Sequence, residues 1–205
     1  MKKYLTIILT SLMAFVSMAC SGTAKTNEVT NKESGNMKAI VIYFSHAGEN
    51  YSVGNIKEGN TKLVADIICE LTGADRFEIV AEKSYDMAYA PLCDLAQEEQ
   101  QKGELPAFKG NINNIDDYDT VFIGGPIWWG TYPQVMFTFF SKYDLNGKTI
   151  IPFTTHEGSG LGSAVNDLKK AYPNATFKDA LSIYGHDVRT SGKKSVEAWL
   201  KKLGM

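Results

Sequence analysis

The chain has few residues of the kinds that bind metals. It contains three histidines and three cysteines among its 205 residues. The histidines, His46, His156 and His186, are scattered along the sequence, and no two cysteines have the short spacing of a metal-binding motif. The sequence therefore predicts no metal site.

A surplus of positive charge is also missing. Lysine and arginine number 21 against 23 aspartate and glutamate residues, so the formal net charge at pH 7 is −2. Because nucleic-acid binding depends on a basic surface, we expect no nucleic-acid partner. Internal repeats are absent as well, and the length and composition favour one domain with one core.

The N-terminus has the layout of a secretory signal. Two lysines are followed by an apolar stretch, Tyr4 to Ala19, that ends in small residues before Cys20. The residues around Cys20 resemble a bacterial lipoprotein processing site, in which the cysteine is lipidated and becomes the mature N-terminus. An ordinary cleaved signal and an uncleaved anchor are the alternatives.

This interpretation divides the chain into three segments. Residues 1–19 are a lipoprotein-type signal peptide, residues 20–36 a flexible tether and residues 37–205 a folded domain. The tether is predicted because its residues are almost all polar and cannot offset the entropy lost on ordering. We therefore expect an exported protein, held at a membrane by its lipid anchor and facing the periplasm or the cell exterior.

Two cysteines, Cys69 and Cys93, belong to the predicted domain. Cys69 lies inside a helical pattern, and the two residues are far apart in the sequence. We interpret them as two buried thiols, although an oxidising compartment would allow a disulfide.

Strand and helix patterns alternate along the domain. A continuous apolar run such as 39–44 is typical of a strand buried on both faces of a parallel sheet. The predicted strands are 39–44, 76–80, 119–124, 148–153 and 176–184. The helices include 60–72, capped by Asn60 and Thr61, a solvated helix within 86–102 after a leading loop, 134–141, 164–171 and a closing helix around 196–203. This alternation predicts a doubly wound α/β fold with a five-stranded parallel sheet.

Three of these strands end in unusual loops, which cover 45–50, 125–132 and 154–162. Small and hydroxyl residues at the end of a buried strand leave backbone N–H groups free, and a nearby helix start adds its positive end, so the first loop suits a phosphate. Because the carboxyl ends of parallel strands meet at one edge of a sheet, the three loops should converge on one ligand.

The three loops together resemble those of the flavodoxin-like family. The resemblance rests on Tyr43 to Gly48 with Gly59-Asn60-Thr61, on Gly124 to Gly130 and on Thr154 to Gly160, and it covers the chain from about Lys38 to Gly204. It implies the strand order 2-1-3-4-5 and FMN as the cofactor.

The resemblance also implies which residues bind FMN. The first loop and the start of the following helix would hold the phosphate, and an indole of the second loop would stack on the flavin ring. The expected cofactor-binding residues are Ser45, His46, Ala47, Gly48, Asn60, Thr61, Pro126, Ile127, Trp128, Trp129, Gly130, Thr155, Gly158, Ser159 and Gly160. His156 and Glu157 are candidates for catalysis, with exposed loop polar residues as the alternative, and His186 is interpreted as a surface loop residue.

Two features depart from the family pattern. Glu49 places a like charge near the proposed phosphate, so either its side chain should point away or the phosphate should lie nearer Asn60-Thr61. The excursion from Tyr51 to Glu58 splits the usual compact loop, and we interpret it as a lid. The third loop lacks an aromatic residue, so one flavin face should be open or covered by Tyr51 or Tyr89.

The expected function is FMN-dependent electron transfer outside the cytoplasm, with a redox protein or a membrane electron donor as partner. An FMN-dependent reductase of quinones or similar small oxidants is the alternative, and a flavin-free binding lipoprotein on the same fold is the second. Because export separates the protein from soluble nicotinamide cofactors, we expect slow or absent oxidation of NADH or NADPH.

Overall fold

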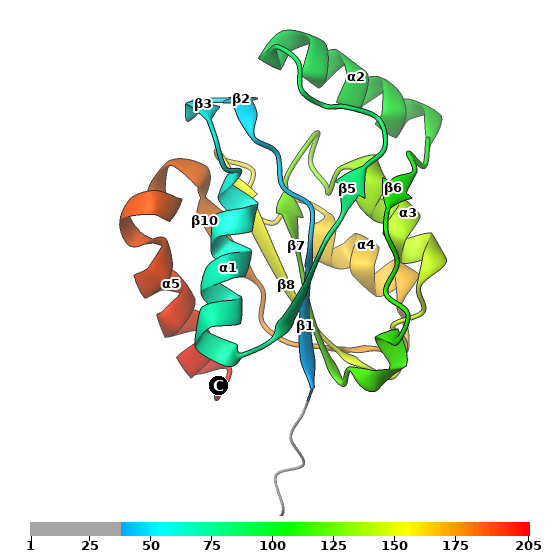
Figure 1. Cartoon of the computed structure of the whole chain (residues 1–205), viewed down its shortest axis with the longest axis vertical. Helices are drawn as coiled ribbons and strands as arrows, with labels where there is room; N and C mark the ends of the chain where they lie inside the picture. The colour runs from blue at the N-terminus through cyan, green and yellow to red at the C-terminus, as the bar shows by residue number, and fades with distance from the viewer. Residues whose placement is uncertain (1–37) are drawn as a thin grey trace, which may run out of the picture. The chain divides into compact units, whose positions relative to one another are not determined.

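A parallel sheet covered by helices on both faces forms the centre of the computed structural model, which describes residues 38–205 (Figure 1). The predicted signal peptide 1–19, the lipidation site Cys20 and the tether 20–36 lie outside the described residues.

The order of the strands in the sheet agrees with the prediction. Across the sheet the strands are β4 (Asp75–Glu78), β1 (Ala39–Tyr43), β7 (Thr120–Pro126), β8 (Thr149–His156) and β10 (Leu181–Tyr184). All neighbouring pairs are parallel. This is the predicted order 2-1-3-4-5, with the first strand of the domain near the middle of the sheet.

The predicted last strand, 176–184, is broken into two pieces. The short β9 (Thr176–Phe177) and β10 both pair with β8, so the sheet has six strands in five positions. Between them, the carbonyl of Asp179 accepts a hydrogen bond from the Trp199 indole at 2.9 Å. That carbonyl is therefore turned toward a helix rather than toward the sheet.

Five helices cover the two faces of the sheet. In Figure 1, α1 (Asn60–Thr72) and α5 (Val188–Lys202) lie on one side, while α3 (Gln134–Lys142) and α4 (Ala164–Ala171) lie on the other and α2 (Tyr89–Lys102) lies at the top. Alternate residues of β1 point to opposite faces, as the twofold repeat of a strand requires. The residues that face α1 and α5 are Val41 and Tyr43, and those that face the other side are Ile40 and Ile42.

The excursion between the first strand and the first helix folds into an antiparallel hairpin, made of β2 (Gly48–Asn50) and β3 (Gly54–Ile56). The remaining short elements are β5 (Val80–Ala81), which pairs with β6 (Phe108–Lys109), and the 3₁₀ turns η1 (Ile115–Asp117) and η2 (Gly185–Asp187). In Figure 1 the hairpin stands at the same end of the sheet as α2.

Helix α1 begins and ends at the predicted residues, but its N-terminus is capped differently. Gly73 ends it in a left-handed conformation with φ 70°, and its N–H donates to the Cys69 carbonyl. Asn60 and Thr61, the expected caps, make no side-chain cap bond. Instead the Ser45 hydroxyl accepts a hydrogen bond from the Lys62 amide at 3.0 Å, because the chain brings the end of β1 against the helix start.

The two cysteines of the described residues are free and half-buried. Burial raises the pKa of the Cys69 thiol. Among residues 38–205, no group of three or more histidine, cysteine or acidic side chains is placed to hold a metal ion. In the same part of the chain, every helix is too short or too polar to cross a bilayer.

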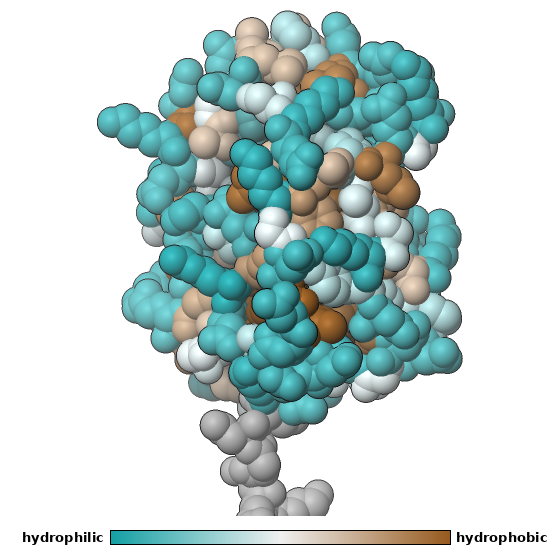
Figure 2. Space-filling view, turned by 45° about the vertical axis from the view of Figure 1, so that its right-hand side comes forward, coloured by the Kyte–Doolittle hydropathy of each residue, from teal (hydrophilic) through white to brown (hydrophobic). Residues whose placement is uncertain are grey.

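The surface is mainly hydrophilic. On the face drawn in Figure 2, apolar residues form small areas separated by polar ones. Most of the larger apolar side chains of the sheet and helices are buried in the two clusters on either side of the sheet.

Candidate functional site

A cavity of about 590 Å³ opens at the carboxyl end of the sheet. The loop after β1 and the ends of β7 and β8 line one part of it, and the β2–β3 hairpin and the first turns of α2 line another. Its lining includes His46, Glu49, Asn50, Tyr51, Val53, Asn60, Tyr89, Ala90, Leu92, Cys93, Asp94, Ala96, Pro126, Ile127, Trp128, Trp129, Thr155, His156, Glu157, Ser159 and Gly185. The volume is in the range of cavities that hold small ligands and cofactors.

The first loop touches the start of α1 so closely that only glycine fits between them. A Cβ atom on Gly59 would lie 2.1 Å from the Ser45 hydroxyl and 2.5 Å from the His46 carbonyl oxygen. Within residues 38–205, the amides of Ala47, Asn60 and Thr61 have no hydrogen-bond acceptor. Unpaired amides at a helix start, with the positive end of the helix dipole behind them, form a ready binding site for an anion.

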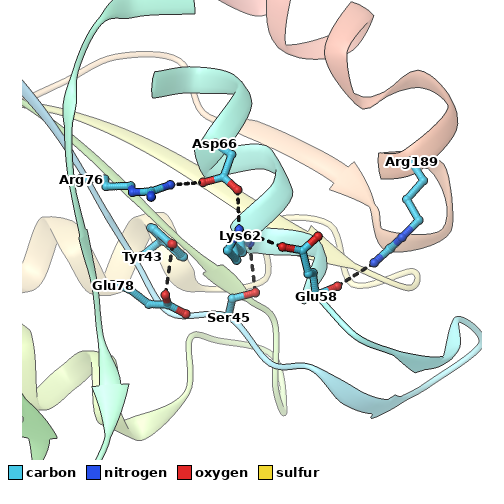
Figure 3. Close-up of polar contacts among 8 residues, drawn as sticks. All are labelled: Tyr43, Ser45, Glu58, Lys62, Asp66, Arg76, Glu78 and Arg189. Atoms are coloured by element: carbon cyan, nitrogen blue, oxygen red, sulfur yellow. Dashed lines mark hydrogen bonds and ion pairs between the residues drawn. The ribbon is translucent and has the colours of Figure 1, made fainter. Parts of the chain in front are cut away.

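Polar contacts surround this helix start (Figure 3). The Lys62 ammonium lies 3.1 Å from the Glu58 carboxylate and 2.6 Å from Asp66, which also pairs with Arg76 at 2.6 Å. From α5, the Arg189 guanidinium reaches toward the residue before Gly59 and donates to the Glu58 carbonyl at 2.6 Å. Its second hydrogen bond goes to the Asn60 side-chain oxygen.

A buried contact joins the start of α1 to the third loop. The hydroxyls of Thr61 and Thr155 lie 2.7 Å apart and share a hydrogen bond, and both residues are buried. Next to it, the Thr154 hydroxyl donates to the Gly160 carbonyl at 3.1 Å. The start of α1 and the third loop are therefore held together by a specific bond.

The two tryptophans of the second loop play different parts. The ring of Trp128 is partly buried and meets the rings of Phe44, Tyr85 and His46 edge to face at 5.4 to 5.7 Å. Trp129 is 50% exposed, and its indole N–H donates to the Cys93 carbonyl of α2 at 2.9 Å. Its φ of 47° is unusual for a bulky residue, so the loop holds this side chain in a set position beside the cavity.

His46 is buried, and its Nε2 atom has no hydrogen-bond partner among the described residues. Burial lowers the pKa of this histidine, although a backbone hydrogen bond with Glu49 and the charge of Asp86 oppose the shift. The ring is therefore neutral at pH 7. An unsatisfied buried nitrogen beside a cavity is the kind of group that a ligand can satisfy.

Glu157 and His186 form a pair at the opposite side of the cavity. The His186 ring nitrogen Nδ1 lies 2.7 Å from the Glu157 carboxylate, whose other oxygen accepts the His186 amide at 2.9 Å. The hydrogen bond with Glu157 raises the pKa of His186. His186 is exposed, as predicted, but it is also the partner of Glu157, a candidate catalytic residue, and no sequence pattern indicates this contact.

His156 lies beside this pair but has other contacts. Its Nδ1 accepts the Gly158 amide at 2.9 Å, and its ring centroid lies 4.4 Å from that of Tyr184. Burial lowers the pKa of this histidine. His156 is thus a neutral ring at the cavity edge near neutral pH.

The hairpin is bonded to α2. The Glu49 carboxylate accepts the backbone N–H of Tyr89, the first residue of α2, at 2.8 Å. The rings of Tyr51 and Tyr89 lie side by side with centroids 5.9 Å apart. The charge of Glu49 is therefore engaged at the positive end of α2, and the two tyrosines stand together at the cavity.

The structure brings most of the expected cofactor-binding residues to one place. Those that line the cavity are His46, Asn60, Pro126, Ile127, Trp128, Trp129, Thr155 and Ser159, together with the candidates His156 and Glu157. Ser45, Ala47 and Gly48 lie on an adjoining hollow that shares His46. Thr61 is buried behind them, while Gly130, Gly158 and Gly160 shape the loops without lining either space.

The sequence missed the contribution of α2 and of α5. Helix α2 lines the cavity through Ala90, Leu92, Cys93 and its neighbours, although its composition indicated only a solvated helix. Arg189 lies 129 positions after the residue that it contacts. No spacing rule could have paired them.

Free amides at a helix start, beside an aromatic-lined cavity at the carboxyl edge of a parallel sheet, are the arrangement of a ligand site in a doubly wound α/β protein. The family model described as flavodoxin matches residues 38–203. The chain belongs to the flavodoxin family.

Solved structures give the same result. A flavoprotein structure from Bacteroides eggerthii is 30% identical, with a TM-score of 0.65 over 82% of this chain and 98% of that one. One from Bacteroides uniformis is 27% identical, with a TM-score of 0.66 over 80% and 98%. A Lactobacillus acidophilus flavoprotein, solved in complex with FMN, shares the fold at 21% identity and a TM-score of 0.55 over 77% and 99%. No curated protein matches the chain.

Proposed function

We propose that this protein binds FMN and transfers electrons outside the cytoplasm. The observation that carries the proposal is the placement of the unpaired amides at the start of α1 next to the tryptophan-lined cavity. A ligand in which a short polar chain joins a phosphate to a flat apolar ring could bind the amides with its phosphate and fill the cavity with its ring.

The residues at the helix start fit a phosphate. The first turn of α1 contains no acidic residue, so its dipole is not offset there. The amides of Ala47, Asn60 and Thr61 would donate to the phosphate oxygens. Glu49, the feature that argued most against a phosphate, is bonded to the start of α2 instead.

The residues of the cavity fit a flavin ring. Trp129 offers a half-exposed indole for stacking. Trp128 anchors the second loop by packing edge to face against three aromatic rings. Bound FMN would supply the redox chemistry. The protein would orient the ring, exclude water from it and hold the hydrogen-bonded pair of Glu157 and His186 at its side.

The hairpin and α2 favour a second candidate, an FMN-dependent reductase of quinones or similar small oxidants. Tyr51, Val53 and Tyr89 extend the cavity beyond the tryptophans and add an aromatic wall. A carrier needs only an exposed ring edge and a protein partner, whereas a reductase needs room for a second flat molecule.

The proposed location is the periplasm or the cell exterior, with a lipid on Cys20 as the anchor. It rests on the N-terminal sequence alone. An exported protein would draw electrons from a membrane or protein donor, and its acceptor would be a redox protein or a small oxidant.

The visible spectrum of the purified protein after addition of FMN tests the main proposal. We expect a bound flavin with quenched fluorescence, and a lack of binding would leave the flavin-free alternative. A redox titration that resolves two one-electron steps would favour the carrier. Rapid oxidation of NADH or NADPH would contradict the expected donor and favour the reductase.

A further inference from the structure

Arg189 is a cation next to the proposed phosphate site whose charge is not matched by a carboxylate. Its two hydrogen bonds go to neutral acceptors, the Glu58 backbone carbonyl and the Asn60 side-chain oxygen. Among residues 38–205, it makes no ion pair within 4.0 Å. By contrast, Lys62 and Arg76, the other cations in Figure 3, are both paired with acidic side chains.

The position of Arg189 in its helix is unfavourable without an anion nearby. It is the second residue of α5, in the turn where the helix dipole is positive and disfavours a cation. The side chain extends from this turn toward the start of α1 and bonds the residues on either side of Gly59. The positive N-terminal ends of α1 and α5 and the Arg189 guanidinium therefore all lie near Gly59.

Arg189 also sets the direction of the Asn60 amide. A guanidinium has only donors, so the atom facing it must be the amide oxygen. The amide nitrogen then lies on the other side, against Gly185, where an added Cβ would approach it to 2.4 Å. Asn60 and Gly185 both line the cavity. The donor of Asn60 is thus held at the border between the cavity and the helix start.

We propose that Arg189 supplies the positive charge for the ligand's phosphate and so makes the site prefer FMN over riboflavin. This inference rests on the proposed function. The two flavins share the ring and the sugar chain and differ in the phosphate. A residue that acts on the phosphate must change the affinity for FMN and leave that for riboflavin unaltered.

The test compares the affinities of the purified protein for FMN and for riboflavin by fluorescence quenching. In Arg189→Gln we expect FMN to bind about five- to tenfold more weakly, as the loss of an exposed charge a few ångströms from a phosphate implies, while the riboflavin affinity stays within about twofold. Arg189→Lys keeps the charge and should retain most of the preference for FMN. Raising the salt concentration should weaken FMN binding more in the wild-type protein than in Arg189→Gln.

Two other cations serve as matched controls. Lys193 lies on the same helix but is paired with Glu70 at 2.7 Å, so Lys193→Gln removes the same charge without touching the helix start. Lys57 is exposed two residues before Gly59, and Lys57→Gln tests whether any nearby cation would do. We expect both variants to bind both flavins like the wild-type protein.

Several results would overturn the inference. Equal weakening of FMN and riboflavin in Arg189→Gln would show that Arg189 acts through the fold. If Arg189→Lys lost as much of the preference for FMN as Arg189→Gln, the charge of Arg189 would not be the cause of that preference. The same conclusion would follow if only Lys57→Gln weakened FMN binding without changing riboflavin binding. If the wild-type protein bound FMN and Arg189→Gln matched it, the inference would fail and the proposed function would stand. If the wild-type protein bound neither flavin, both would fail.

Discussion

Gly59 is the residue whose replacement tests the site geometry most directly. It separates the end of β1 from the start of α1, and a Cβ atom there would lie 2.1 Å from the Ser45 hydroxyl and 2.5 Å from the His46 carbonyl oxygen, where ordinary contacts begin at 3.4 Å. The Ser45 side chain can rotate away, but it then gives up the Lys62 amide at 3.0 Å. The His46 carbonyl is backbone and moves only if the loop moves.

These contacts set the expected loss of stability in Gly59→Ala. Overpacking a site of this kind costs about 1–3 kcal/mol, and losing the hydroxyl that caps α1 costs about 1 kcal/mol more. We therefore expect the free energy of unfolding to fall by about 2–4 kcal/mol, which is a large part of the stability of a typical domain. With a urea slope of about 2 kcal/mol per molar, the midpoint should fall by about 1–2 M.

Gly192 provides the matched control for a glycine-to-alanine change. It lies inside α5, and its added Cβ would meet Val188 at an ordinary 3.5 Å. Gly192→Ala should therefore raise the stability by about 0.5–1 kcal/mol, through helix propensity alone. Urea unfolding of both variants, at unchanged slope, measures the two effects.

A double variant separates the two close contacts of Gly59. Ser45→Ala removes the hydroxyl but leaves the His46 carbonyl in place, so Ser45→Ala combined with Gly59→Ala should remain as unstable as Gly59→Ala or more so. The reasoning is wrong if Gly59→Ala unfolds within about 0.5 kcal/mol of the wild-type protein, the size of an ordinary surface change.

The remaining predictions concern the cavity. Because burial holds the pKa of His46 below its ordinary value of 6.5, the unfolded chain takes up the proton first, and stability should decline as the pH falls below about 6.5. In His46→Gln, the urea midpoints at pH 7.5 and pH 5 should therefore lie closer together than in the wild-type protein. An equal drop of the midpoint in both proteins would contradict this. Glu49→Gln removes the charge at the start of α2 and should weaken the hydrogen bond with the Tyr89 amide by about 0.3–1 kcal/mol. We expect faster amide hydrogen exchange in the hairpin. Unchanged exchange would mean that the hydrogen bond of the Glu49 carboxylate does not stabilise the hairpin. Trp129→Ala should weaken FMN and riboflavin alike, by about two- to twelvefold for a stacking energy of about 0.5–1.5 kcal/mol, and unchanged affinities would place the ring elsewhere.

The fold could be predicted because its signals are local. The apolar runs of β1 and β7 are buried on both faces and therefore lack the alternation of a half-exposed strand. Helix α1 carries its own apolar period and its own glycine stop. The order of the strands and the convergence of three loops then followed from the family resemblance and from the rule that ligands bind at the carboxyl ends of parallel strands.

Predictions that required a contact between distant segments were less successful. The sequence placed the cap of α1 on Asn60 and Thr61, but the cap comes from Ser45. It identified the excursion after β1 but could not show that Glu49 ties the resulting hairpin to α2.

By itself, the sequence determined the alternation of strands and helices, the family and the residues of the three loops, because each of these is written in neighbouring residues with a fixed period or motif. Only the tertiary structure decided which charges matter. Glu157 is matched by His186 and Lys62 by Asp66, while Arg189 is left with neutral acceptors beside the start of α1. The physical reason is that electrostatic pairing depends on distances of a few ångströms between side chains that are far apart in the chain.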